Sequence, residues 1–206
     1  MKKNQLILCG LLCLLVGCSK PAEQQAKPKQ EDVACQDASP VVKEEFYEIY
    51  DISKYEEEFM RYQWYIFDQK GEVLGHDIDR SLGGGLPNIE KFESLLVVHE
   101  GGGTGVFFRT FFDPINSLAS KRYGNPYGYT TEYVMTMDSD YKALRYDVVI
   151  QEIFSGKEIK REQLDFAHVA DVSFSIKEVH FLTDEKAVEI TYLNEQNELS
   201  ERVITY

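Results

Sequence analysis

Short apolar and aromatic runs separated by polar turn residues dominate residues 41–206. Four of these runs are rich in β-branched or aromatic residues, and each ends at Asp, Asn, Ser, Gly or Pro: residues 62–67, 106–112, 144–154 and 187–193. β-branched and aromatic side chains favour strands, and the terminating residues supply turn geometry. The pattern therefore predicts a series of antiparallel hairpins.

The hairpins recur at a nearly constant spacing. Their turns begin near residues 68, 113, 155 and 194, which are 45, 42 and 39 residues apart. A further strand is predicted before three of the hairpins, at residues 95–99, 133–137 and 178–182. The prediction is an all-β fold of antiparallel meander repeats of about 42 residues. A sandwich, a barrel and a small propeller-like arrangement all fit this spacing, and the chain carries no WD or kelch signature.

Three local features qualify this picture. Ser53 and Glu56 have capping-box spacing, so residues 53–58 are predicted as one short N-terminal helix, with an acidic loop as the equal alternative. Residues 138–140 are predicted as a turn. The glycine-rich segment 101–105 is predicted to join two strands, because a phosphate loop would lead into a helix and here a strand follows.

The N-terminal pattern is different. Lys2 and Lys3 precede an apolar run of eleven residues, 6–16. That length suits the core of a signal peptide and is too short to span a bilayer core of about 30 Å. The run ends in Leu15-Val16-Gly17-Cys18.

This tetrapeptide resembles the lipobox of bacterial lipoproteins. The resemblance covers residues 1–18 and implies cleavage between Gly17 and Cys18, a diacylglyceryl group on the Cys18 thiol, and an acyl chain such as palmitate on the new amino group. A protein held by two or three acyl chains is anchored stably in a membrane. Ser19 in place of Asp leans toward the outer membrane, facing the periplasm, if the source is Gram-negative.

Residues 18–40 are predicted to form a tether. Residues 19–40 contain three prolines and no aromatic residue, so they cannot bury enough apolar surface to order themselves. The predicted organisation is a signal peptide at 1–17, the lipidated cysteine and disordered tether at 18–40, and an acidic all-β domain at 41–206.

Cleavage changes what the cysteines and charges imply. Cys9 and Cys13 leave with the signal peptide and Cys18 carries lipid, so Cys35 in the tether is the remaining thiol. The whole chain has a formal charge of −13, while residues 41–206 carry 17 Lys and Arg against 31 Asp and Glu. This excess of acids argues against binding to nucleic acid and to anionic lipid, and favours a basic protein partner.

The segment 121–129, which its Gly, Asn and Pro residues predict to be a loop, is the main candidate for binding. It holds two cations and three tyrosines in an acidic domain, and Tyr and Arg are favoured contact residues. We therefore predict a binding role for Arg122, Tyr123, Tyr127 and Tyr129. The alternative is a turn whose tyrosines pack back on the sheet.

The sequence predicts no catalytic residue, cofactor or metal site. It lacks a serine elbow and an HExxH pattern, and His76, His99, His168 and His180 are not spaced as metal ligands on one element. The function expected is a lipid-anchored envelope lipoprotein with a non-catalytic interaction domain, one form being an immunity-type inhibitor of a basic partner. The alternatives are an envelope hydrolase that uses paired carboxylates and a structural lipoprotein of a larger assembly.

Overall fold

The structure is a computed structural model that describes residues 39–52, 62–79, 86–102, 105–140, 145–167 and 172–206. The signal peptide, Cys18, Cys35, all of the tether up to residue 38, the helix expected at 53–58 and His168 lie outside the described residues. Within them, no helix is long and apolar enough to cross a membrane.

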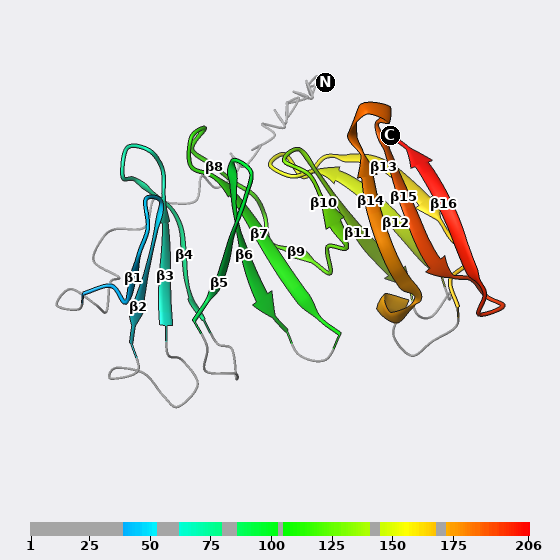
Figure 1. Cartoon of the computed structure of the whole chain (residues 1–206), viewed down its shortest axis with the longest axis horizontal. Coiled ribbons are helices and arrows are strands. Elements are labelled where there is room, and N and C mark those ends of the chain that lie inside the picture. The colour runs from blue at the N-terminus through cyan, green and yellow to red at the C-terminus, as the bar shows by residue number, and fades with distance from the viewer. Residues whose placement is uncertain (1–38, 53–61, 80–85, 103–104, 141–144, 168–171) are drawn as a thin grey trace, which may run out of the picture. The chain divides into compact units, whose positions relative to one another are not determined.

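The described residues of the domain form four antiparallel sheets in chain order (Figure 1). The first contains β1 (Val42–Lys43), β2 (Tyr47–Asp51), β3 (Tyr62–Phe67) and β4 (Val73–Asp79). The second contains β5 (Asn88–Phe92), β6 (Leu95–Gly101), β7 (Phe107–Asp113) and β8 (Leu118–Ala119), with β9 (Tyr123–Gly124) also paired to β7. The third contains β10 (Gly128–Tyr129), β11 (Tyr133–Asp140), β12 (Arg145–Glu152) and β13 (Glu158–Gln163). The fourth contains β14 (Ile176–Leu182), β15 (Ala187–Leu193) and β16 (Leu199–Thr205).

The predicted all-β fold of repeated meanders is confirmed. Apart from β9, which also pairs with β7, the strands of each sheet lie in sequence order, and neighbouring strands are antiparallel as in a meander. Two 3-10 turns, η2 (Val172–Ser175) and η3 (Thr183–Glu185), flank β14. The glycine-rich segment 101–105, in which residues 103 and 104 are not described, is followed by strand β7 as predicted. The Gly102 N–H donates to the Val106 carbonyl at 2.9 Å.

Two local predictions are wrong. Residues 138–140 belong to strand β11 and are not a turn, because Asp138 pairs with Asp147 and Asp140 pairs with Arg145 in an unbroken antiparallel register. The segment 121–129 is not wholly a loop, because it contains the two-residue strands β9 and β10. Acidic and glycine-rich sequences suggested turns, whereas pairing with a neighbouring strand decided the backbone.

The turns that close three of the meanders share one device. Asp68, Asp113 and Asn194 each end or follow a strand and accept two backbone N–H groups of the turn through a side-chain oxygen. The distances are 2.8 and 2.9 Å at Asp68, 3.1 and 3.0 Å at Asp113, and 3.0 and 3.0 Å at Asn194. Such bonds are the mechanism by which Asp and Asn favour turns.

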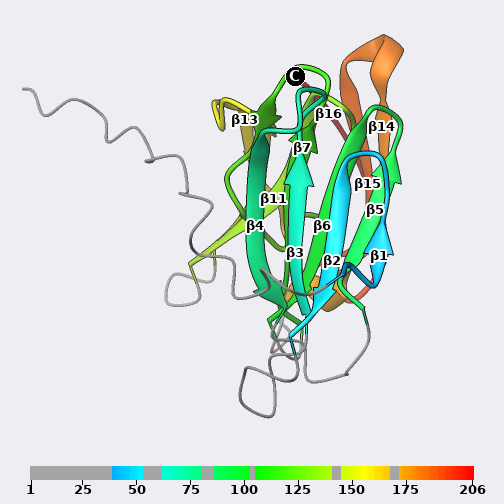
Figure 2. The same cartoon turned by 90° about the vertical axis from the view of Figure 1, so that its left-hand side faces the viewer.

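Neighbouring sheets pack face to face through three apolar clusters. One cluster joins the first and second sheets, one the second and third, and one the third and fourth. In β6, Leu96 and Val98 face the first sheet while Leu95 and Val97 face the third. A sheet covered on both faces explains the unbroken apolar run in that strand. In Figure 2 the first sheet faces the viewer.

The last sheet is covered on one face. Val188, Ile190 and Tyr192 of β15 enter the cluster shared with the third sheet, while Glu189 and Thr191 alternate with them. This period of two is the pattern of a sheet with one buried face.

Candidate functional site

A hollow of about 540 Å³ is the candidate site, and it brings together three of the four sheets. The second sheet contributes the last residue of β5 and the turn after it, the third contributes β10 and the residues after it, and the fourth contributes β14 and the residue after it. The lining residues are Phe92, Glu93, Gly128, Tyr129, Thr130, Thr131, Val179, His180, Phe181 and Thr183.

The hollow runs along strand edges. Val179, His180 and Phe181 are consecutive residues of β14, and all three line it. Side chains of a strand alternate between its two faces, so consecutive residues border one space only where that space lies along the backbone edge. β10 and β14 are each the end strand in the order of their sheet.

A close approach of two strands forms one side of the hollow. A Cβ atom placed on Gly128 would lie 2.7 Å from Cγ1 of Val179, which is closer than two non-bonded carbon atoms approach in proteins. Glycine is therefore required for β10 to pack against β14 at this distance. The contact brings Tyr129 and Phe181 into the same lining.

The lining combines aromatic, hydroxyl and charged groups. Phe92, Tyr129 and Phe181 supply ring surface, three threonines supply hydroxyls, and Glu93 is the one carboxylate among the lining residues. His180 Nε2 lies 3.3 Å from Glu178 Oε2, and both side chains are largely exposed. Carboxylates beside aromatic faces suit a cationic group, because both attract positive charge.

A set of four residues, the Arg109 cluster, holds Tyr129 in place: Glu90, His99, Arg109 and Tyr129. The Arg109 guanidinium carbon lies 5.0 Å from the centre of the Tyr129 ring. Arg109 Nε–H donates to His99 Nδ1 at 3.2 Å, and His99 Nε2 lies 2.8 Å from Glu90 Oε2. The Tyr129 hydroxyl donates to the same Glu90 oxygen at 3.3 Å, so the four side chains form a closed ring of contacts.

These contacts determine the protonation of the cluster. Because His99 Nδ1 accepts from Arg109, its proton is on Nε2, where it donates to Glu90. Burial and the Arg109 charge lower the pKa of His99, against a smaller opposing effect of Glu90. Burial also raises the pKa of the Tyr129 hydroxyl. Tyr129 therefore stands as a neutral, oriented ring at the wall of the hollow.

The four residues predicted from the segment 121–129 have different environments. Tyr129 lines the hollow. The Tyr127 ring packs edge-on against Phe107, with ring centres 5.9 Å apart. Tyr123 is 2% exposed and its hydroxyl donates to the Ile153 carbonyl at 2.7 Å.

Arg122 lies on the surface, away from the lining residues. Its guanidinium carbon is 3.8 Å from the centre of the Phe108 ring, and its Nε lies 2.8 Å from Glu100 Oε2. Of the four predicted residues, only Tyr129 lines the hollow. A binding role for Tyr123 and Tyr127 is not tested by these contacts. A binding role for Arg122 stays a prediction.

Sequence reasoning missed most of the lining, including Phe92, Glu93 and Phe181. These residues lie in strands and turns that read as ordinary sheet elements, and nothing local marks them as neighbours. Gly128 next to Tyr129 was the one usable signal, because a glycine inside a strand suggests a close backbone approach.

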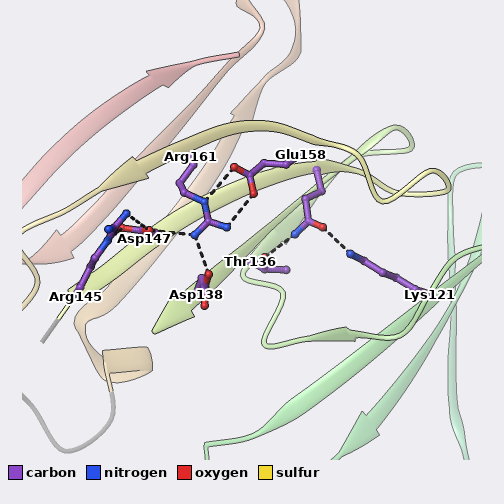
Figure 3. A network of polar contacts seen from close by, with 8 residues as sticks. Lys121, Thr136, Asp138, Arg145, Asp147, Glu158 and Arg161 are labelled. Carbon is purple, nitrogen blue, oxygen red and sulfur yellow. Dashed lines mark hydrogen bonds and ion pairs between the residues drawn. The ribbon is translucent and has the colours of Figure 1, made fainter. Parts of the chain in front are cut away.

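A second polar group lies on the third sheet and shares no residue with the hollow lining (Figure 3). Arg161 bonds Asp138 at 2.8 Å, Asp147 at 3.0 Å and Glu158 at 2.9 Å, and Asp147 also accepts from Arg145. The hydrogen bonds from Arg145 and Arg161 hold the pKa of Asp147 below its usual value, against the effect of burial. Each of these carboxylates is already paired with arginine, so we interpret the group as one that ties β11, β12 and β13 together.

Among the described residues, no group of three or more His, Cys, Asp or Glu side chains is placed to hold a metal ion. The alternative of a hydrolase that uses paired carboxylates stays a prediction.

No family model matches this chain, and no curated protein is significantly similar to it.

Proposed function

We propose that this protein is a lipid-anchored lipoprotein of the bacterial envelope whose domain binds a basic protein partner without catalysis. The observation that carries the proposal is the aromatic hollow with carboxylates at and beside it, in a domain with 14 more acidic than basic residues. A domain of this charge attracts a basic protein over several ångströms and selects it by complementarity. Immunity-type inhibition of a basic protein is one form of this function.

The N-terminal segment supports the membrane half of the proposal. The basic start, the apolar run and Cys18 together resemble a lipobox. Two or three acyl chains on Cys18 would hold the protein at a membrane, and residues 19–40 would let the domain reach a partner near it.

The anchor is tested by Cys18→Ser. We expect the variant to accumulate as an unprocessed precursor or to leave the membrane fraction, because the acceptor thiol is lost. Fractionation followed by intact-mass measurement distinguishes these outcomes. Cys35→Ser is the matched control and should be processed and fractionate like the wild type. A Cys18→Ser protein that is still processed and membrane-bound would overturn the anchor.

The interaction is tested by cross-linking the intact protein in its membranes at low and at high salt. We expect recurrent capture of a protein with net positive charge that is lost as salt rises, because screening shortens the range of the attraction. Repeated preparations that capture no basic protein, or a capture indifferent to salt, would contradict the proposal.

A further inference from the structure

We infer that the hollow receives a lysine or arginine side chain from an extended segment of the partner, and that this segment pairs with the open edge of β14. This inference rests on the proposed function for the basic character of the partner. It adds the place of binding, the conformation of the bound segment and the group that is recognised.

The open edge of β14 is the first observation. The sheet order ends at β14, which pairs with β15 on one side. Among the described residues no strand is paired with its other side. β14 spans seven residues, Ile176–Leu182, whereas the edge strand β10, which also borders the hollow, spans two. A strand edge presents backbone N–H and C=O groups, and an extended peptide can add to it as a further strand.

The position of the hollow along this edge is the second observation. Val179, His180 and Phe181 border it in succession, so a segment lying along β14 would lie against the hollow. Its alternate side chains would point to opposite faces, and one set would enter the space between the third and fourth sheets. Pairing with β14 would therefore fix how far each side chain of the partner segment enters the hollow and how far apart these side chains lie.

The chemistry of the lining selects the side chain. Phe92, Tyr129 and Phe181 offer ring surface, and Glu93 offers a carboxylate. The Glu90 carboxylate is 3.3 Å from the Tyr129 hydroxyl, and Glu178 lies on β14 itself. A guanidinium or ammonium group gains from both ring faces and carboxylates. The Arg109 cluster already orients Tyr129, so that ring needs little reordering on binding.

Three kinds of segment could pair with the open edge of β14: a second copy of this domain, the tether of this chain, or a segment of another protein. Charge and backbone chemistry favour the last. A second copy of this domain would bring further negative charge to an acidic surface. The tether of this chain carries lysines, but its prolines at positions 21 and 28 lack the N–H that strand pairing needs. A basic segment of another protein can pair its backbone with β14 and place a cationic side chain in the hollow.

The test uses the processed protein in non-ionic detergent and capped peptides of about nine residues, a length that covers one strand. The probe alternates arginine with threonine. Two comparison peptides replace each arginine with glutamate or alternate threonines with proline. Binding is measured by calorimetry, and the bound edge is located by hydrogen exchange of backbone amides.

We expect the arginine peptide to bind and to protect amides of β14, and the glutamate and proline peptides to fail. Glu93→Gln with Glu178→Gln should weaken binding about tenfold, since each removes an exposed carboxylate from the site. Glu195→Gln with Glu201→Gln removes the same charge from the exposed β15–β16 turn and β16, and should leave affinity nearly unchanged.

Three results would overturn the inference: equal binding of the proline peptide, protection away from β14, or equal losses in the two double variants. If cross-linking captures a basic partner that the Glu93 and Glu178 changes do not release, the inference fails and the proposed function stands. If the peptide binds at β14 but no basic partner is captured, the edge site stands and the proposed function fails.

Discussion

His99 shows how one residue couples the interior to the wall of the hollow. Its Nδ1 accepts from Arg109, and Arg109 in turn packs over Tyr129 and donates to the Pro126 carbonyl at 2.8 Å. A proton added at Nδ1 would face the Arg109 donor and replace a hydrogen bond by a repulsion. The folded protein therefore resists protonation of His99, in agreement with its lowered pKa.

This residue predicts a pH dependence of stability. The unfolded chain protonates His99 near the usual pKa of 6.5, whereas the folded chain does so at lower pH. The contribution of neutral His99 to stability is therefore fully present above about pH 6.5. It is lost as the pH falls toward the lower pKa that His99 has in the folded protein. Urea unfolding of the wild type should lose more stability between about pH 7.5 and 5.5 than unfolding of His99→Gln. Equal losses in the two proteins would contradict the role given to His99.

Tyr123 is the predicted binding residue whose contacts indicate a role in packing. Its hydroxyl donates to the carbonyls of Glu152 and Ile153, and burial raises its pKa to about 12. Tyr123→Phe should lower the free energy of unfolding by about 1 kcal/mol, because one buried and one partly buried carbonyl lose their donor. Affinity for the arginine peptide should not change. A loss of affinity at unchanged stability would instead place Tyr123 in the binding site.

At the scale of elements, the sheets of this domain pack closely face to face, and Gly75 of β4 lies at one such contact. A Cβ atom there would lie 2.5 Å from Cε1 of Phe112 in β7. Phe112 cannot easily withdraw, since it is 3% exposed and its ring packs edge-on against Trp64. The first and second sheets therefore approach each other over a glycine.

Gly75→Ala should destabilise the protein by about 1–3 kcal/mol, the usual effect of overfilling a packed core. Gly101→Ala at the end of β6 is the matched control, because a Cβ atom there meets nothing within 4 Å. It should change stability by less than about 0.5 kcal/mol. Equal urea midpoints for the two variants would show that this contact does not limit the approach of the sheets.

The same scale separates what could be predicted from what could not. The strands and the turns at Asp68, Asp113 and Asn194 followed from local rules, because a turn depends on its own side chains. The hollow could not be predicted, because its lining comes from three meanders far apart in sequence. Residues 138–140 were misassigned because their pairing partners lie on β12.

At the scale of the whole molecule, the fold gains no help from covalent cross-links if the lipobox resemblance holds. Cys9 and Cys13 then leave with the signal peptide, and lipid occupies Cys18. The processed protein should contain one free thiol, at Cys35, and its urea midpoint should be the same with and without reductant. Thiol titration and paired unfolding curves check this. A midpoint that drops with reductant would reveal a disulfide, and with it retention of a second cysteine.

The sequence by itself determined the antiparallel meanders, the positions of most turns, the acidity of the domain and the likeness of residues 1–18 to a lipoprotein signal. These properties depend on neighbours along the chain or on composition. Only the tertiary structure decided that Tyr123 is buried while Tyr129 faces a hollow, and that β10, β14 and the turn after β5 meet there. The alternation of apolar residues states which side chains are buried, but the partner of each buried face depends on how separate sheets pack.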